Sequence, residues 1–93
     1  MSYQKRTPVE ENQEEIIKAV TTVSFENSRE VPQKSFHETR WVTSGEVMEY
    51  LAEFSDRRWS PHSVRYYLNS LVKREKLVAK QELKRFTLHY SLP

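Results

Sequence analysis

The spacing of hydrophobic residues changes at Lys76, from the helical period of three to four residues before it to strand-like alternation after it. Residues 77–82 favour one strand, and residues 85–92 alternate between apolar and polar side chains, as a second strand does. The connection between them, 82–84, is short enough for a hairpin, although it lacks the Gly or Asn that such turns prefer. We expect one side of the second strand to carry its apolar residues, Phe86, Leu88, Tyr90 and Leu92.

A capping signal marks the start of a helix in the middle of the chain. Thr43 and Glu46 have the spacing of a capping box, in which the Thr side chain accepts from the third helical amide and the Glu reaches back. The apolar stripe that follows predicts a helix ending near Phe54 or Ser55. The pair 41–42, just before the cap, favours a short strand.

A second signal, Ser60 followed by Pro61, opens another helix, which we expect over 61–74. Ser is a favoured N-cap, and Pro is tolerated at the first helical position because its missing N–H has no partner there. The residues at helical spacing that face the predicted core are Val64, either Tyr67 or Leu68, Leu71 and Val72.

The N-terminal half carries weaker signals. Residues 1–11 lack apolar periodicity and favour a flexible tail. Asn12 can cap a helix that continues to about Phe25, since apolar residues recur at helical spacing from Ile16 onward. Residues 26–40 predict a long connector, and we expect 12–93 to form a single α+β domain.

The predicted order of helix, short strand, helix, helix and hairpin is similar to that of the winged helix-turn-helix superfamily. The segment 43–51 resembles the second helix of that superfamily, and 60–71 resembles its recognition helix. The resemblance implies three helices, a C-terminal β-hairpin wing, a short strand before the second helix, and binding to double-stranded DNA. Two residues depart from the pattern: Lys76 stands where Gly with a left-handed backbone is common, and Leu83 stands at the wing tip.

The charge of the chain is divided along its length. Residues 1–56 hold six basic and eleven acidic side chains, whereas residues 57–93 hold nine basic and two acidic ones. These halves carry net charges of −5 and +7, which give the +2 of the whole chain. A division of this kind suggests one face for a polyanion and another turned away from it.

The predicted helix 61–74 supplies the candidate contacts to DNA in the major groove. We expect base contacts from its outward residues, with Arg65 reading guanine and Asn69 reading adenine. The base-contacting set is His62, Ser63, Arg65, Tyr66 and Asn69. The backbone-contacting set, which includes the basic wing, is Arg57, Arg58, Ser60, Lys73, Arg74, Lys80, Lys84 and Arg85.

Several chemistries find no support in the sequence. The chain has no cysteine, a single glycine and no pair of histidines at ligand spacing, so we expect no metal, no cofactor and no Gly-rich phosphate loop. Ser60 and His62 lie too close along one helix start for a nucleophile and its base, and we expect no enzyme. No apolar run approaches the ~18 residues of a membrane span, and the expected location is the cytoplasm or nucleoid.

The sequence thus predicts a sequence-specific DNA-binding protein, such as a small transcriptional regulator. Two other interpretations remain open: a winged-helix module that binds a protein partner, and a basic domain that associates with RNA or the ribosome. A homodimer through the first helix and the N-terminal segment is also expected, because many small DNA readers bind two half-sites.

Overall fold

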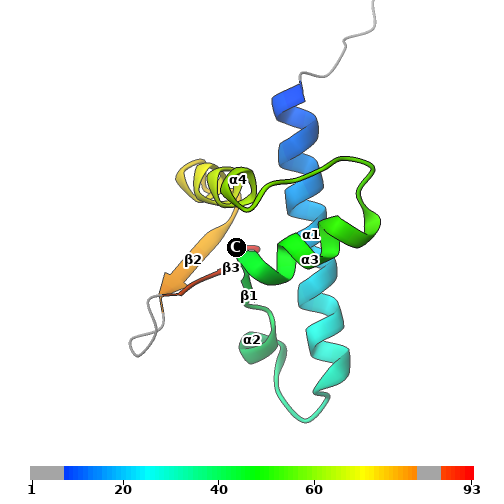
Figure 1. The fold of residues 1–93 in the computed structure, drawn as a ribbon. Coiled ribbons are helices and arrows are strands. Elements are labelled where there is room, and N and C mark those ends of the chain that lie inside the picture. The colour runs from blue at the N-terminus through cyan, green and yellow to red at the C-terminus, as the bar shows by residue number, and fades with distance from the viewer. Residues whose placement is uncertain (1–7, 82–86) are drawn as a thin grey trace, which may run out of the picture.

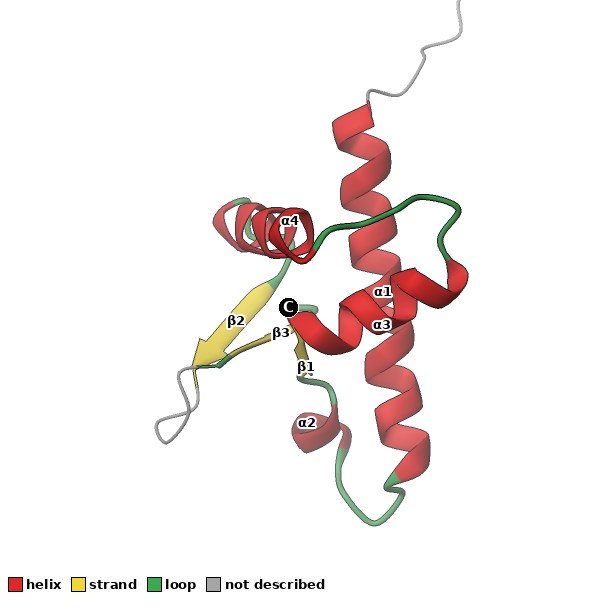
Figure 2. Ribbon diagram, in the orientation of Figure 1, coloured by secondary structure: helices red, strands yellow, loops and turns green. Residues whose placement is uncertain are grey.

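The computed structural model describes residues 8–81 and 87–93, and it is an α+β arrangement (Figures 1 and 2). Figure 1 shows a long N-terminal helix crossed by a shorter one, with a further helix and the sheet beside it. In chain order the elements are α1 (Pro8–Glu30), α2 (Phe36–Thr39), β1 (Val42–Thr43), α3 (Ser44–Phe54), α4 (Pro61–Lys73), β2 (Val78–Gln81) and β3 (Leu88–Ser91).

Helix α1 is longer at both ends than the sequence predicted. It begins at Pro8, so residues 8–11, which were expected to belong to the flexible tail, form its first turn, and Asn12 is not its cap. Pro8 suits that position, and acidic residues in the first turn interact favourably with the helix dipole. The helix runs on to Glu30 and ends just before Val31, whose helical conformation is disfavoured by the following proline. Residues 1–7 of the predicted tail lie outside the described residues.

Most of the predicted connector 26–40 is therefore helical, and the connector is shorter than the sequence predicted. Its first five residues continue α1, and its end forms the one-turn helix α2, a fourth helix where three were expected. The Ser24 hydroxyl donates to the carbonyl of Arg40 at 2.6 Å, and the Arg40 guanidinium donates to the Ser91 hydroxyl at 2.7 Å and to the carbonyl of Leu92. Arg40 therefore joins the end of this segment to α1 and to the C-terminal strand.

The caps predicted for α3 and α4 are both confirmed. The Glu46 amide donates to the Thr43 hydroxyl at 3.2 Å, and the Thr43 amide donates to the Glu46 carboxylate at 3.1 Å, which completes the capping box of α3. The Ser63 amide donates to the Ser60 hydroxyl at 3.1 Å, and Pro61 occupies the first turn of α4. Local hydrogen-bonding chemistry thus sets where these two helices begin.

Helix α4 ends in a Schellman motif centred one residue earlier than expected. The Lys76 amide donates to the carbonyl of Leu71 at 2.9 Å, and the Glu75 amide donates to that of Val72 at 3.0 Å. The left-handed residue of this motif is Glu75, with φ of 62°, and not Lys76. The prediction for Lys76 was wrong by one position, because Glu75 occupies the site at which a helix commonly ends with Gly.

The three strands form an antiparallel sheet in the order β1-β3-β2. Val42 pairs with Tyr90, and β2 pairs along β3 from Val78 opposite Ser91 to Gln81 opposite Leu88. The alternation predicted for the last strand holds only in part. Tyr90 is buried as expected, but Leu88 is exposed and Ser91 is buried, because Arg40 donates to its hydroxyl. The predicted hairpin turn at 82–84 and Phe86 lie outside the described residues.

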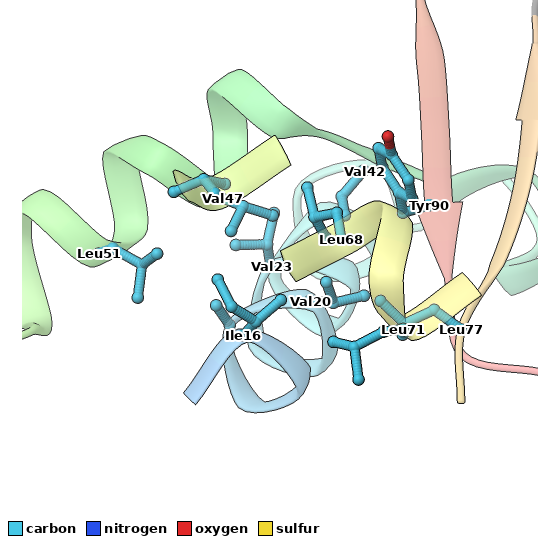
Figure 3. Packing of buried hydrophobic residues seen from close by; sticks show 12 residues of the cluster. Ile16, Val20, Val23, Val42, Val47, Leu51, Leu68, Leu71, Leu77 and Tyr90 are labelled. Atoms are coloured by element: carbon cyan, nitrogen blue, oxygen red, sulfur yellow. The ribbon is translucent and has the colours of Figure 1, made fainter. Parts of the chain in front are cut away.

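The core lies where α1, α3, α4 and the sheet meet (Figure 3). Four of its residues come from α1, and α4 contributes three that are completely buried, as predicted from their spacing. The full cluster is Ile16, Ala19, Val20, Val23, Val42, Val47, Leu51, Val64, Leu68, Leu71, Leu77 and Tyr90. One side of α4 is thereby held in the core, and its other side is left to the solvent.

Candidate nucleic-acid interface

The solvent-facing side of α4 forms a continuous surface opposite the buried residues of the helix. Its members recur every three or four positions, and together they line a groove of about 610 Å³. The groove residues are His62, Arg65, Tyr66, Asn69, Ser70 and Lys73, hereafter the α4 face. Ser70 was not predicted, although its helical spacing from Tyr66 places it on this side.

The α4 face is cationic and contains no carboxylate. Helix α4 carries Arg65 and Lys73 and no Asp or Glu between Pro61 and Lys73. Arg65, Tyr66 and Lys73 are exposed, and Tyr66 is 63 % accessible in the centre of the surface. The helix thus presents an exposed aromatic ring and two positive charges on one surface, an arrangement suited to an anionic partner.

Helices α1 and α3 are acidic by comparison. Helix α1 carries six glutamates against Lys18 and Arg29, and α3 carries three glutamates and no basic residue. The charge division predicted from the sequence therefore coincides with a division between elements, with α4 on the basic side.

Ser60 and Ser63 are engaged at the start of α4. The Ser60 hydroxyl accepts from the Ser63 amide at 3.1 Å and donates to the Ser63 hydroxyl at 2.9 Å. The cap therefore occupies the Ser60 hydroxyl, which was predicted as a phosphate contact. Ser63, a predicted base contact, is half-buried and is not among the groove residues.

Asn69, the predicted adenine reader, is bonded to the sheet. The Tyr90 hydroxyl of β3 donates to Asn69 Oδ1 at 2.8 Å. Burial raises the pKa of Tyr90 above its usual value of 10.0, and the positive charge of Arg65 opposes this shift only in part. Tyr90 therefore keeps its proton at neutral pH and remains a donor to Asn69.

Arg57 belongs to a polar cluster behind the start of α4, hereafter the Glu15 cluster. The Glu15 carboxylate lies 2.8 Å from Arg57 Nη2 and accepts from Trp59 Nε1 at 3.4 Å and from the hydroxyl of Ser55. Arg57 also donates to the side-chain oxygen of Asn12, so α1 and the turn before α4 are joined.

Electrostatics favour the charged form of Glu15 in this cluster. Burial acts to raise the pKa of the Glu15 carboxyl, but hydrogen bonds from Ser55 and Trp59, together with the positive charge of Arg57, outweigh it and hold the pKa below the usual 4.5. The charged Glu15 thus forms an ion pair with Arg57. By contrast, Arg58 is exposed and makes no ion pair with any residue of 8–81 or 87–93.

Those of the remaining predicted backbone contacts that the structure describes lie at the end of α4 and on β2. Arg74 is the exposed C-cap of α4. On β2, Lys80 is exposed, and its ammonium group lies 4.5 Å from the ring centroid of Trp41, over which the guanidinium of Arg40 also lies at 5.0 Å. Lys84 and Arg85 lie outside the described residues.

The described part of the chain offers neither a cluster of metal ligands nor a membrane-spanning helix. Among residues 8–81 and 87–93, no three His, Cys, Asp or Glu side chains gather so that they could hold a metal ion. None of the helices in those ranges is long and apolar enough to cross a bilayer.

The fold and this surface define a small α+β domain that presents one cationic helix face. Comparison of the chain with protein-family models, with curated proteins and with solved structures gives no match.

Proposed function

We propose that this chain is a winged-helix protein that binds double-stranded DNA sequence-specifically, as a small transcriptional regulator does. In this proposal α4 is the recognition helix in the major groove, and β2 and β3 are the wing. The order α1, β1, α3, α4, β2, β3, with β1 added to the hairpin as a third strand, is compatible with that arrangement.

The observation that carries the proposal is the α4 face, which is exposed, cationic and free of carboxylates. A helix of 13 residues is about 20 Å long, and the major groove, about 12 Å wide, admits a single helix. The opposite side of α4 is fixed in the core, so side chains on the face are presented from a rigid support.

The role of each residue depends on the charge or hydrogen-bonding groups that its side chain still has available for DNA. Arg65 is exposed, and its guanidinium can donate two parallel hydrogen bonds to guanine. His62 and Tyr66 flank it in the groove. The residues best placed for phosphates are the exposed cations Arg58, Lys73, Arg74 and Lys80.

The direct test is duplex binding followed by fluorescence anisotropy as a function of salt. We expect affinity for a random duplex to fall steeply between about 50 and 200 mM salt, because each neutralised phosphate releases counterions. At a site selected from random duplexes, Arg65→Ala should weaken binding by about 1–3 kcal/mol. Arg29→Ala is the matched control, since it removes an equal charge from the last turn of α1 and should leave binding unchanged. Absence of duplex binding at low salt would exclude the proposal.

A protein partner is the second candidate, and the exposure of Tyr66 favours it. Tyr is enriched among residues that dominate protein interfaces, and this one is 63 % accessible. Salt separates the candidates: a duplex complex weakens steeply with salt, whereas one that depends on burying Tyr66 weakens little. Structured RNA in the same titration tests the third interpretation, RNA or ribosome association.

The homodimer expected through the first helix belongs to the same proposal. The first turn of α1 stands clear of the other elements in Figure 1, and Phe25 of the same helix is 60 % exposed. Light scattering at two protein concentrations tests it, with Phe25→Ala as the variant that should shift the protein to monomer. An unchanged molar mass across concentrations would exclude the dimer.

A further inference from the structure

The hydrogen bond between Tyr90 and Asn69 constrains what the α4 face can read. Tyr90 is 2 % exposed, and Figure 3 shows its hydroxyl oxygen pointing away from the apolar cluster against which its ring packs. That hydroxyl donates to Asn69 Oδ1 at 2.8 Å. A residue of the core thereby fixes the orientation of an amide on the exposed surface.

The opposite orientation of the amide is less favourable. If the Asn69 side chain turned over, its NH₂ group would donate to the Tyr90 oxygen, and the Tyr90 proton would lose its acceptor. Within the described ranges that proton has no acceptor other than Asn69 Oδ1. A buried hydroxyl without a partner costs about 1–3 kcal/mol, so the oxygen of Asn69 stays directed at Tyr90.

This orientation changes the chemistry that Asn69 offers to a base. Reading adenine requires the amide oxygen to accept from N6 while the amide nitrogen donates to N7. The oxygen is directed at Tyr90, whereas the Nδ2 group makes no hydrogen bond within the described part of the chain and has two N–H groups to donate. Arg65, one turn earlier on the same side of α4, is also a pure donor.

We propose that Tyr90 is a specificity-determining residue, which holds Asn69 as a donor so that the pair Arg65 and Asn69 reads guanine rather than adenine. Guanine presents two adjacent acceptors, N7 and O6, in the major groove. Adenine has an amino donor, N6, in place of the acceptor O6. This amino group would face the Asn69 Nδ2 group, which is also a donor. This inference rests on the proposed function.

The test is selection from random duplexes with the whole chain and four variants. Asn69→Ala identifies the base pair that residue 69 reads, as the one whose preference disappears. Tyr90→Phe releases the amide, and at that pair it should raise the affinity for adenine relative to guanine by about tenfold. Tyr67→Phe is the matched control, because it removes a hydroxyl that accepts from Asn12 at 2.9 Å and makes no bond to Asn69.

Asn69→Asp, the fourth variant, does not alter the core. Its carboxylate can still accept from Tyr90 but has nothing to donate, so the guanine preference at that pair should be lost and cytosine, whose N4 donates, preferred. Thermal melts show whether Tyr90→Phe folds, and if it does not, a wild-type preference for adenine at that pair still overturns the inference.

The outcomes separate the inference from the proposed function. Guanine in the wild type, together with adenine in Tyr90→Phe, supports the inference. Adenine already in the wild type, an unchanged preference in Tyr90→Phe, or no effect of Asn69→Ala at any pair would overturn the inference and leave the proposed function standing. Absence of binding to any duplex would overturn both.

Discussion

The left-handed residue at the end of α4 yields the sharpest prediction about stability. Glu75 has φ of 62°, a conformation that costs a residue with a Cβ roughly 1 kcal/mol and costs glycine almost nothing. Glutamate is also the wrong charge at a helix C-terminus, where removing it is worth a few tenths of a kcal/mol. We therefore expect Glu75→Gly to increase the free energy of unfolding by about 1 kcal/mol.

Two further substitutions separate the backbone effect from the charge effect. Glu75→Ala removes the charge but keeps the Cβ, so it should gain only about 0.3 kcal/mol. Lys76→Gly tests the position that the sequence favoured. Because φ is not positive at Lys76, glycine there only adds conformational freedom to the unfolded chain. Lys76→Gly should therefore lower the free energy of unfolding by about 0.5–1 kcal/mol.

Urea unfolding followed by circular dichroism measures all three variants, with thermal melts as a second reading. For a domain of this size, 1 kcal/mol corresponds to a change in Tm of ~4–8 °C. If Glu75→Gly were no more stable than Glu75→Ala, the backbone argument would be wrong. If Lys76→Gly were more stable than the wild type, the left-handed residue would be Lys76, as the sequence predicted.

Three more predictions concern the support of α4. Leu68→Ala should cost about 3 kcal/mol in urea unfolding, because it leaves a cavity in the core, whereas Phe25→Ala, at a 60 % exposed site, should cost under about 0.5 kcal/mol when both are measured at a concentration where the chain is monomeric. Arg40→Ala should cost about 2 kcal/mol by removing the bonds to the C-terminal strand, while Lys34→Ala, at an exposed position nearby, should cost almost nothing. Glu15→Gln should cost about 1 kcal/mol at pH 7, and this difference should disappear in acid.

The acid dependence of the Glu15 cluster has a definite sign. Its carboxyl has a folded-state pKa below the unfolded value of 4.5, so its charge stabilises the fold above pH 4.5 and that contribution is lost as the pH falls through the folded pKa. Unfolding measured from pH 7 downward should show wild type and Glu15→Gln converging below pH 4.5. A constant difference down to the lowest pH at which the chain folds would contradict the role of the carboxylate.

Equal losses in Leu68→Ala and Phe25→Ala, or in Arg40→Ala and Lys34→Ala, would contradict the packing described for those residues.

The parts of the fold that sequence alone predicted are those set by local chemistry. The capping box of Thr43 and Glu46, and the Ser60 cap followed by Pro61, depend on residues at most three positions apart, and both are confirmed. The buried side of α4 followed from helical spacing. The exposed members of the α4 face followed from the same geometry, since they are what remains once the buried positions are fixed.

The predictions that failed depended on contacts between distant segments. Asn12 was interpreted as a helix cap, but it lies inside α1 and donates to the hydroxyl of Tyr67, 55 positions away. The alternation predicted for the last strand sets Ser91 opposite its apolar residues, but Ser91 is buried and its hydroxyl accepts from Arg40 of the former connector. No local pattern indicates these partners, because an amide or a guanidinium is compatible with solvent and with a tertiary hydrogen bond alike.

The same tertiary contacts change the assignment of roles on the proposed DNA-binding surface. Arg57, Ser60 and Asn69 were all expected to contact DNA, yet each uses a charge or a hydrogen-bonding atom in holding α4: Arg57 with Glu15, Ser60 in the helix cap, and Asn69 with Tyr90. A group that already has a partner in the free protein gains less from a new one, because the old bond must be broken first. Readout should therefore depend most on Arg65, whose guanidinium makes no hydrogen bond or ion pair within the described residues. The engaged residues then fix the position and orientation from which it reads.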